Sequence, residues 1–228
     1  MKIYVLPLIF SIVIGLTYYY VNKLKIKNRP GHEKLLSIAA GVSVTYILLE
    51  LFPSFTEVAF IINRYLFITI LLGFVIHHLI EKEIYQHNQR NELVKLLTIE
   101  ENVFSFSYHI ILGIILVVFS RQSFIQGILA FIPILTFTLV STIPLRAHNS
   151  KPKAIALASS TLIGVILAIT LKIPLWFEFS LIGTAIGILL YAVIRHHIPF
   201  GRKGNVSYFV LGTLLYTAFI VLTWHLSS

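Results

Sequence analysis

Long apolar runs alternate with short polar segments along the whole sequence. Each run approaches the roughly 20 residues that an α-helix needs to cross a bilayer. Charged and turn-forming residues gather between the runs, so the pattern predicts an all-α integral membrane helix bundle of about eight transmembrane helices. The predicted spans are 3–22, 35–53, 60–80, 103–120, 124–145, 153–171, 174–194 and 205–226.

The fourth predicted span, VFSFSYHIILGIILVVFS, carries a histidine inside its apolar run. His109 is expected roughly 9 Å into a hydrocarbon layer that is about 30 Å thick. Ser105, Gly113 and Ser120 fall within roughly 80° of it on a helical wheel and complete a stripe of polar and small residues. An ionisable group at membrane depth is costly and usually faces a bundle interior or a watery path. We therefore expect this stripe to face inward.

Two other spans carry polar stripes. The stripe of the second span consists of Ala39, Ser43, Tyr46 and Glu50. The stripe of the fifth span consists of Gly127, Thr138, Ser141 and Thr142. Glu50 is expected about one turn below the outer surface. Because spans four and five run in opposite directions, Thr138 is expected at about the depth of His109.

The seventh span contains two glycines four residues apart, Gly183 and Gly187. A small-xxx-small pattern of this kind lets two helices approach closely. It predicts a contact face for a neighbouring helix of the chain or for a possible homodimer. Glu178 projects from the other side of the same helix, and we expect it at the membrane interface.

Basic residues are distributed unequally between the two sides of the predicted bundle. One side has fourteen of the 18: Lys23, Lys25, Lys27, Arg29, Lys34, Lys82, Arg90, Lys95, Arg146, Lys151, Lys153, Arg195, Arg202 and Lys203. The other side has four: Lys2, Arg64, Arg121 and Lys172. The positive-inside rule places the richer side in the cytoplasm. It thus predicts a multi-pass protein of the cell membrane with both termini outside and a cytoplasmic loop at 81–102. The weak amphipathic spacing of this loop would allow it to prolong the third span or to lie along the membrane surface.

Composition limits the chemistry of the chain. Hydrophobic residues make up 57% and charged residues 12%, so we expect one transmembrane domain over residues 1–228. Cysteine is absent, which excludes disulfides, thiolate metal sites and cysteine nucleophiles. All nine acidic residues are glutamate, which excludes mechanisms that need an aspartate. The net charge of +9 is accounted for by topology and by contact with the lipid bilayer, and we expect no nucleic-acid partner.

Most histidines lie at the predicted cytoplasmic side. They are His32, His77, His78, His87, His148, His196 and His197. Imidazole suits a membrane interface without any further role. The same residues could also form a mouth that binds a borderline metal such as zinc, which favours nitrogen ligands. Both interpretations remain open at this point.

Three segments resemble a known family. AAGVSVTYILLELFP (39–53) resembles the second span of bacterial ZIP-like permeases, in which a Gly-Val-small-x-Tyr run leads into aliphatic-Glu-Leu-x-Pro. TFTLVSTIPLRAHN (136–149) resembles the end of their fifth span. FSLIGTAIGILLYAVIRHHIPFGRKGNVSYFVLGTLLY (179–216) resembles their last hairpin. Eight spans, outer termini and a longest loop after span three are also similar to the ZIP metal transporters.

The resemblance implies a ZIP-type permease that moves a divalent cation such as Zn²⁺ by alternating access without ATP. The ion is then a transported ligand, and we expect neither a resident cofactor nor enzymatic activity. Glu50 would attract the cation near the outer mouth. The weak central site would consist of His109, Thr138, Ser141 and Thr142. The inner exit would consist of His77, His78, His196 and His197. The first and last three spans would flank spans four and five in opposite orientation, as in inverted repeats.

The sequence departs from the ZIP metal site. ZIP transporters place His, Asn or Asp on the fourth span and a His-Glu-x-x-His-like motif on the fifth. This chain has His109 alone on the fourth span, with Phe137, Ser141 and Thr142 on the fifth. One imidazole and a few hydroxyls are poor ligands for a divalent ion.

Other functions are therefore kept as alternatives. The first is a diverged, non-transporting structural or regulatory membrane protein, in which His109 hydrogen-bonds to a hydroxyl of the fifth span. The others are a histidine-rich membrane metalloenzyme and a haem protein that uses His109 with His77 or His78 as axial ligands.

Overall fold

The computed structural model describes residues 2–24, 31–87, 90–141, 151–194 and 205–227. This part of the chain contains helices and no strand, which confirms the predicted all-α class. Helices α1 to α9 are, in order, Lys2–Leu24, His32–Tyr46, Phe52–Ile62, Phe67–His87, Arg90–Gln122, Phe124–Ser141, Lys151–Thr170, Leu175–Ala192 and Val206–Ser227. A π-helical turn, Ile47–Leu51, joins α2 to α3, and a 3-10 turn, Arg64–Leu66, precedes α4.

These helices correspond to the predicted spans. Because α2, the π turn and α3 form one helical run, the described residues provide six helices that are long and apolar enough to cross a membrane. The shorter apolar helices Phe124–Val140 and Ala154–Thr170 correspond to the fifth and sixth predicted spans. Residues 142–145 of the fifth predicted span lie outside the described part. The chain is a multi-pass helical bundle of the membrane class.

The predicted loop at 81–102 is largely helical. Helix α4 extends to His87 and α5 begins at Arg90, so both helices continue past the predicted ends of their spans. Residues 81–102 contain neither glycine nor proline and are rich in Glu, Lys, Leu and Gln, which favour helix. The segment is therefore helical because its residues favour helix, although its polar composition suggested a loop.

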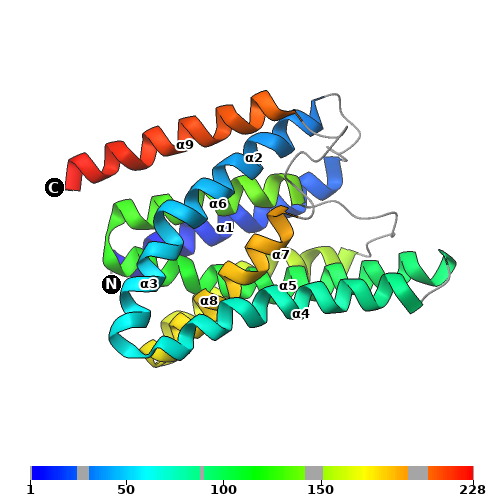
Figure 1. Cartoon of the computed structure of the whole chain (residues 1–228), viewed down its shortest axis with the longest axis horizontal. Helices are drawn as coiled ribbons and strands as arrows, with labels where there is room; N and C mark the ends of the chain where they lie inside the picture. Colours follow the sequence, from blue (N-terminus) through cyan, green and yellow to red (C-terminus); the bar gives the residue numbers. More distant parts are fainter. Residues whose placement is uncertain (1, 25–30, 88–89, 142–150, 195–204, 228) are drawn as a thin grey trace.

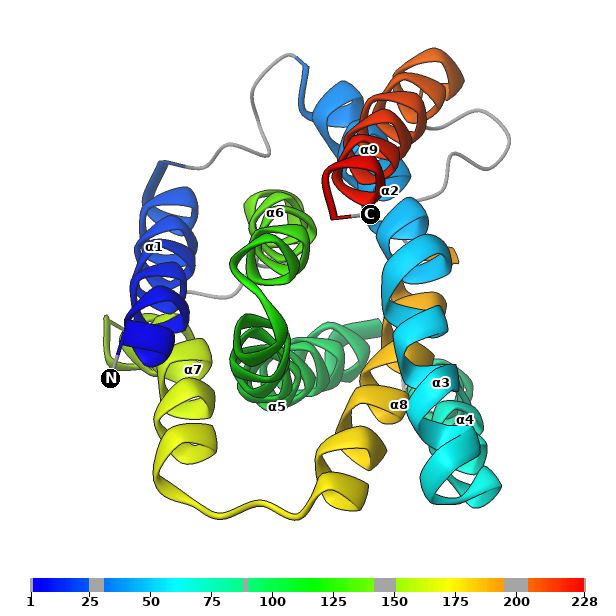
Figure 2. The same ribbon diagram turned by 90° about the vertical axis from the view of Figure 1, so that its left-hand side faces the viewer.

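The helices form two groups (Figure 2). In the first group α1, α5, α6 and α7 pack on one another. The second group consists of two helix pairs, α2 with α9 and α4 with α8, and α3 joins the pairs by packing on α8. The two groups meet where α2 contacts α6 and where α5 contacts α8 and α4.

Glycines allow the closest helix contacts in the second group. A side chain at Gly187 of α8 would collide with the backbone of α4 at Ile70, and Gly73 of α4 lies against α8. A side chain at Gly41 of α2 would collide with the backbone of α9. The predicted contact face of Gly183 and Gly187 is therefore confirmed, and it packs within the chain. This contact does not support its use in a homodimer.

Both termini lie at the same end of the bundle, on the left of Figure 1, which we name the terminal end. The turns between α5 and α6 and between α7 and α8 lie there too (Figures 1 and 2). The other end is named the opposite end. The common location of the termini agrees with the predicted topology, and which end faces the cell exterior stays a prediction.

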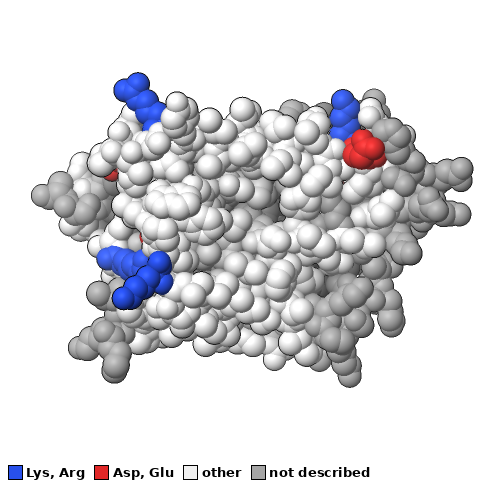
Figure 3. Space-filling model, turned by 90° about the horizontal axis from the view of Figure 1, so that it is seen from below, with Lys and Arg blue, Asp and Glu red and all other residues white. Residues whose placement is uncertain are grey.

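The outer surface of the bundle is apolar. Large hydrophobic side chains such as Leu71, Leu214 and Leu215 are more than half exposed. On the face drawn in Figure 3, charged side chains lie at the two ends, and the described surface between them has none. An apolar belt bounded by charged ends suits contact with lipid acyl chains.

Candidate functional site

His109 lies inside the first helix group. Its side chain is 2% exposed, and Gly113 and Ser120 of the same stripe are also buried. Its Nε2 atom is 3.5 Å from Thr138 Oγ1 on α6. The rings of Tyr18 on α1 and Tyr108 lie edge-on to the imidazole, with centroids 5.6 and 5.8 Å away. The inward direction of the stripe and the common depth of His109 and Thr138 are both confirmed.

The contacts of His109 define its neutral tautomer. Nδ1 is 2.6 Å from the backbone oxygen of Ser105, one turn earlier in α5. A carbonyl oxygen only accepts hydrogen bonds, so the proton lies on Nδ1 and the lone pair on Nε2. The Thr138 hydroxyl donates to the Ile134 carbonyl over 2.7 Å. The same hydroxyl lies 3.5 Å from Nε2, so its proton can go either to the Ile134 carbonyl or to the Nε2 lone pair. When it goes to the carbonyl, lone pairs of Nε2 and of the Thr138 oxygen face each other, and a cation, either a proton or a metal ion, would satisfy both.

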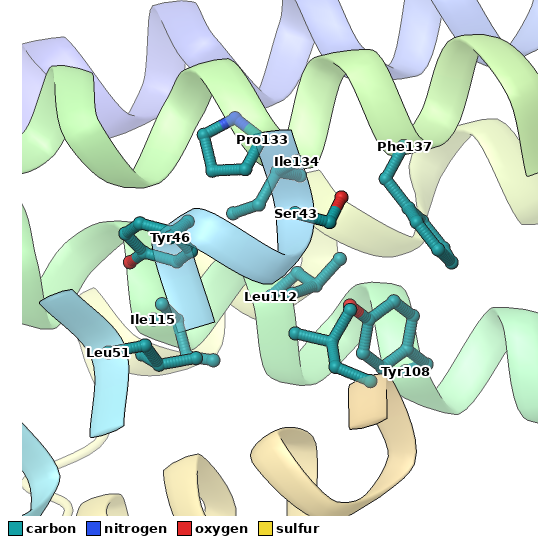
Figure 4. Close-up of a pocket in the computed structure, with 10 residues that line it drawn as sticks. Ser43, Tyr46, Leu51, Tyr108, Leu112, Ile115, Pro133, Ile134 and Phe137 are labelled. Carbon is teal, nitrogen blue, oxygen red and sulfur yellow. The ribbon is translucent and has the colours of Figure 1, made fainter. Parts of the chain in front are cut away.

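A small cavity lies beside this site, between the two helix groups (Figure 4). It has room for about one water molecule. Its lining residues are Ser43, Tyr46, Leu51, Tyr108, Leu112, Ile115, Pro133, Ile134, Phe137 and Leu189. Most of the lining is apolar, but the buried hydroxyls of Ser43 and Tyr46 have no hydrogen-bond partner within the described part of the chain. Tyr108 lines the cavity and also contacts the His109 ring edge-on.

Glu50 is buried and hydrogen-bonded near the terminal end. It lies in the π-helical turn, where the Phe52 N–H bonds the carbonyl of Ile47, five residues earlier. Pro53 lacks an N–H and disfavours a regular helix before it, which explains the irregular turn. The carboxylate accepts hydrogen bonds from Trp224 Nε1 at 2.7 Å and Gln126 Nε2 at 3.3 Å.

The inward face predicted for the second span is confirmed. Each of its four residues is buried: Ala39, Ser43, Tyr46 and Glu50. The polar groups on this face meet different surroundings, since Ser43 and Tyr46 line the cavity while Glu50 is hydrogen-bonded to α6 and α9.

The predicted exit histidines that the structure describes lie on α4. His77 stacks on Phe104 of α5, with ring centroids 4.4 Å apart, and its ring is also 4.8 Å from that of Tyr191 on α8. His78 is exposed, and its ring lies 5.6 Å from that of Tyr191. Both histidines thus lie at the contact of α4 with α8.

The remaining predicted ligands lie outside the described part. Thr142, His196 and His197 are among the residues that the structure does not describe, and Ser141 ends α6 while its side chain is not described. Among the side chains that are described, no three or more His or Glu residues gather as a group that could hold a metal ion. His109 with Thr138 is the part of the predicted central site that the structure brings together.

An ion pair that the sequence did not predict joins three helices at the terminal end. Arg121 Nη1 of α5 lies 2.8 Å from Glu178 Oε1 of α8, and Nη2 donates to the Ala168 carbonyl of α7 at 2.7 Å. Glu178 is at the end of the bundle, as expected, but it is buried against Arg121. Both residues lie at span ends that the predicted topology puts on one side. That shared depth was the signal that could have identified the pair.

Comparisons with known proteins give no further information about this site. No family model matches the sequence. No curated protein matches it either.

Proposed function

We propose that the chain is a secondary transporter of the ZIP-like kind, which moves a divalent cation without ATP. The observation that carries the proposal is that several of the helix contacts are reciprocal. The helices can be exchanged in four matched pairs: α1 with α7, α2 with α8, α4 with α9 and α5 with α6. When every helix is replaced by its match, the contact between α2 and α9 corresponds to the contact between α8 and α4. In the same way, the contact of α2 with α6 corresponds to that of α8 with α5, and the contact of α1 with α6 corresponds to that of α7 with α5. All of these contacts are present in the bundle.

The two helices of each matched pair also run in opposite directions. Each helix is exchanged with one that lies an odd number of spans away, so the two members of a pair cross the bundle in opposite senses (Figure 1). Repeats of inverted orientation are a common architecture of secondary transporters, and their substrate sites lie near the membrane midplane between the repeats. This arrangement favours transport over a purely structural role.

His109 is the proposed contact for the cation. Its Nε2 lone pair and the Thr138 oxygen face each other 3.5 Å apart in a buried region, with no acidic side chain within the contacts described for them. Such a site would hold a divalent ion weakly, because an imidazole and a neutral oxygen supply few ligands and no negative charge. Weak binding suits an ion in transit, which has to leave the site again.

Zinc uptake into proteoliposomes tests the proposal. Wild-type protein should move zinc down its gradient with no ATP on either side, and His109→Ala should reduce the rate at least tenfold. His225→Ala is the matched control, because His225 is exposed at the end of α9, and it should transport as the wild type does. Uptake that is unchanged in His109→Ala would overturn the proposed site.

A diverged, non-transporting membrane protein is the second candidate function. It is favoured by the mostly apolar cavity and by the lack of a metal-holding group among the described side chains. In that case His109 would join α5 to α6 through Thr138. Folded wild-type protein that moves neither zinc, manganese, iron nor cobalt would support this candidate against transport.

A further inference from the structure

Two buried glutamates, Glu50 and Glu81, occupy corresponding places at the two ends of the bundle. Both are 4% exposed. Glu50 follows α2, whose C-terminal end lies toward the terminal end of the bundle. Glu81 is in the C-terminal part of α4, which extends to the opposite end (Figure 1). Each carboxylate accepts a hydrogen bond from an aromatic side chain of the paired helix.

The Glu50 cluster consists of Glu50, Trp224 and Gln126. Trp224 of α9 donates to Oε1, which joins the two helices of one pair in the second group. Gln126 of α6 donates to Oε2 and connects that pair with the first group. The cluster therefore closes the contact between the two groups near the terminal end.

The Glu81 cluster consists of Glu81, Tyr191, His77 and Phe104. The Tyr191 hydroxyl of α8 donates to Glu81 Oε2, which joins the other helix pair of the second group. His77, one turn before Glu81, stacks on Phe104 of α5 and thus contacts the first group. This cluster closes the contact between the groups near the opposite end.

The exchange of helices described above relates the two clusters. It turns the pair α2·α9 into α8·α4 and the contact partner α6 into α5, so the two clusters are built on exchanged helices, although the first reaches its partner from α2 and the second from α4. The carboxylate and the aromatic donor have changed places, since the glutamate follows α2 in one cluster and is on α4 in the other. Because the repeats are inverted, the clusters lie at opposite ends.

We propose that the two clusters are the gates of the transporter, one for each side of the membrane. The proposal rests on the transport function above. Each gate is held by a hydrogen bond to a buried glutamate side chain, and the low local dielectric strengthens such a bond. Each cluster joins the two groups, one toward each end of the bundle, with the cavity between the groups. Opening one cluster while the other stays closed would give access from one side at a time.

The absence of cysteine from the sequence allows a direct test. Ser43→Cys places one thiol in the wall of the cavity. Its rate of modification by a membrane-impermeant maleimide is measured in membrane vesicles of both orientations. A separate Leu226→Cys variant identifies the side of the terminal end, because Leu226 is 72% exposed there.

The matched variants are Trp224→Phe and Tyr191→Phe, each combined with Ser43→Cys. Each variant keeps an aromatic ring and removes the aromatic donor to its glutamate. Trp224→Phe should raise labelling of the cavity thiol about tenfold from the terminal side alone. Tyr191→Phe should raise it similarly from the other side alone. Three results would contradict the proposed gates. They are equal labelling from both sides, an unchanged labelling rate in either variant, and an increase from the same side in both variants.

If Trp224→Phe or Tyr191→Phe fails to fold, a second pair of variants tests the same gates. Gln126→Met and Phe104→Leu remove the contact to the first group at the terminal and opposite ends, and they should open the same sides as Trp224→Phe and Tyr191→Phe. Labelling needs no substrate, so the gates and the cargo are tested separately. Side-specific labelling without zinc uptake would support the proposed gates and reject zinc as the transported ion. Zinc uptake without side-specific labelling would reject the proposed gates.

Discussion

Arg121 and His109 are both on α5, but their polar surroundings differ. Arg121, near the end of the helix, faces the Glu178 carboxylate and the Ala168 carbonyl, so its charge is neutralised by a carboxylate. His109, in the middle of the bundle, faces the Ser105 carbonyl and the Thr138 hydroxyl, which are both neutral. The first region is a charge pair that joins helices, and the second is a set of neutral groups around the histidine at which we propose that a cation binds.

The two regions should therefore respond differently to mutation. Removing one member of a buried ion pair leaves an uncompensated charge and is strongly destabilising. Replacing a neutral imidazole by an apolar side chain loses hydrogen bonds but leaves no charge behind. Stability should depend on Arg121 and Glu178, and cation binding should depend on His109.

The largest effect on stability is expected for Arg121→Met. Its loss leaves Glu178 buried, since that side chain is 6% exposed. We expect a loss of about 2–3 kcal/mol, below the usual value for buried pairs because the Arg121 side chain is partly solvated. The melting temperature of the detergent-purified protein measures it.

The double variant Arg121→Met/Glu178→Leu is the control for this effect. Removing both charges should recover most of the lost stability, because no unpaired charge remains. A double variant as unstable as Arg121→Met would show that the packing of Arg121, including its contact with the Tyr4 ring, matters more than the charge pair.

A smaller effect on stability is expected for His109→Leu. The variant loses the hydrogen bond to Ser105, which contributes about 1 kcal/mol, while the leucine fills most of the space. Thermal unfolding without added metal should therefore stay close to that of the wild type. A loss as large as that of Arg121→Met would assign His109 a mainly structural role.

The smallest effect is expected for Thr138→Val, which removes Oγ1 and keeps the shape of the side chain. Stability should change by about 0.6 kcal/mol, the average for hydrogen bonds between membrane helices. Zinc affinity, measured by titration, should fall several-fold. Thr136→Val is the matched control, because Thr136 bonds the Pro133 carbonyl of its own helix. Equal zinc affinities in the two variants would exclude Thr138 as a ligand.

Hydrophobic periodicity was sufficient to predict the helices and the faces that they turn to the interior of the bundle. The stripes containing Glu50 and His109 face the interior, as predicted, because a single helix determines which of its residues share a face. The segment 81–102, expected as a loop that could prolong the third span or lie along the surface, largely continues α4 and α5, because its residues have high helix propensity. Polar composition alone cannot distinguish an exposed helix from a loop.

Partners from distant parts of the chain could not be predicted from the sequence. Glu50 bonds to Trp224, 174 residues later, and Arg121 pairs with Glu178, 57 residues later. Helical periodicity fixes the depth and direction of each residue but not which helices become neighbours. The depth of Thr138 relative to His109 was predictable because the two helices are consecutive and joined by a short turn.

Zinc-induced thermal stabilisation of the purified protein tests the proposed cation site most directly. A ligand that binds only the folded protein raises its apparent stability by mass action. Zinc above the dissociation constant of the site should raise the melting temperature of the wild type and leave that of His109→Leu unchanged. An equal rise in both proteins, or none in the wild type with zinc, manganese, iron or cobalt, would contradict a cation site at His109.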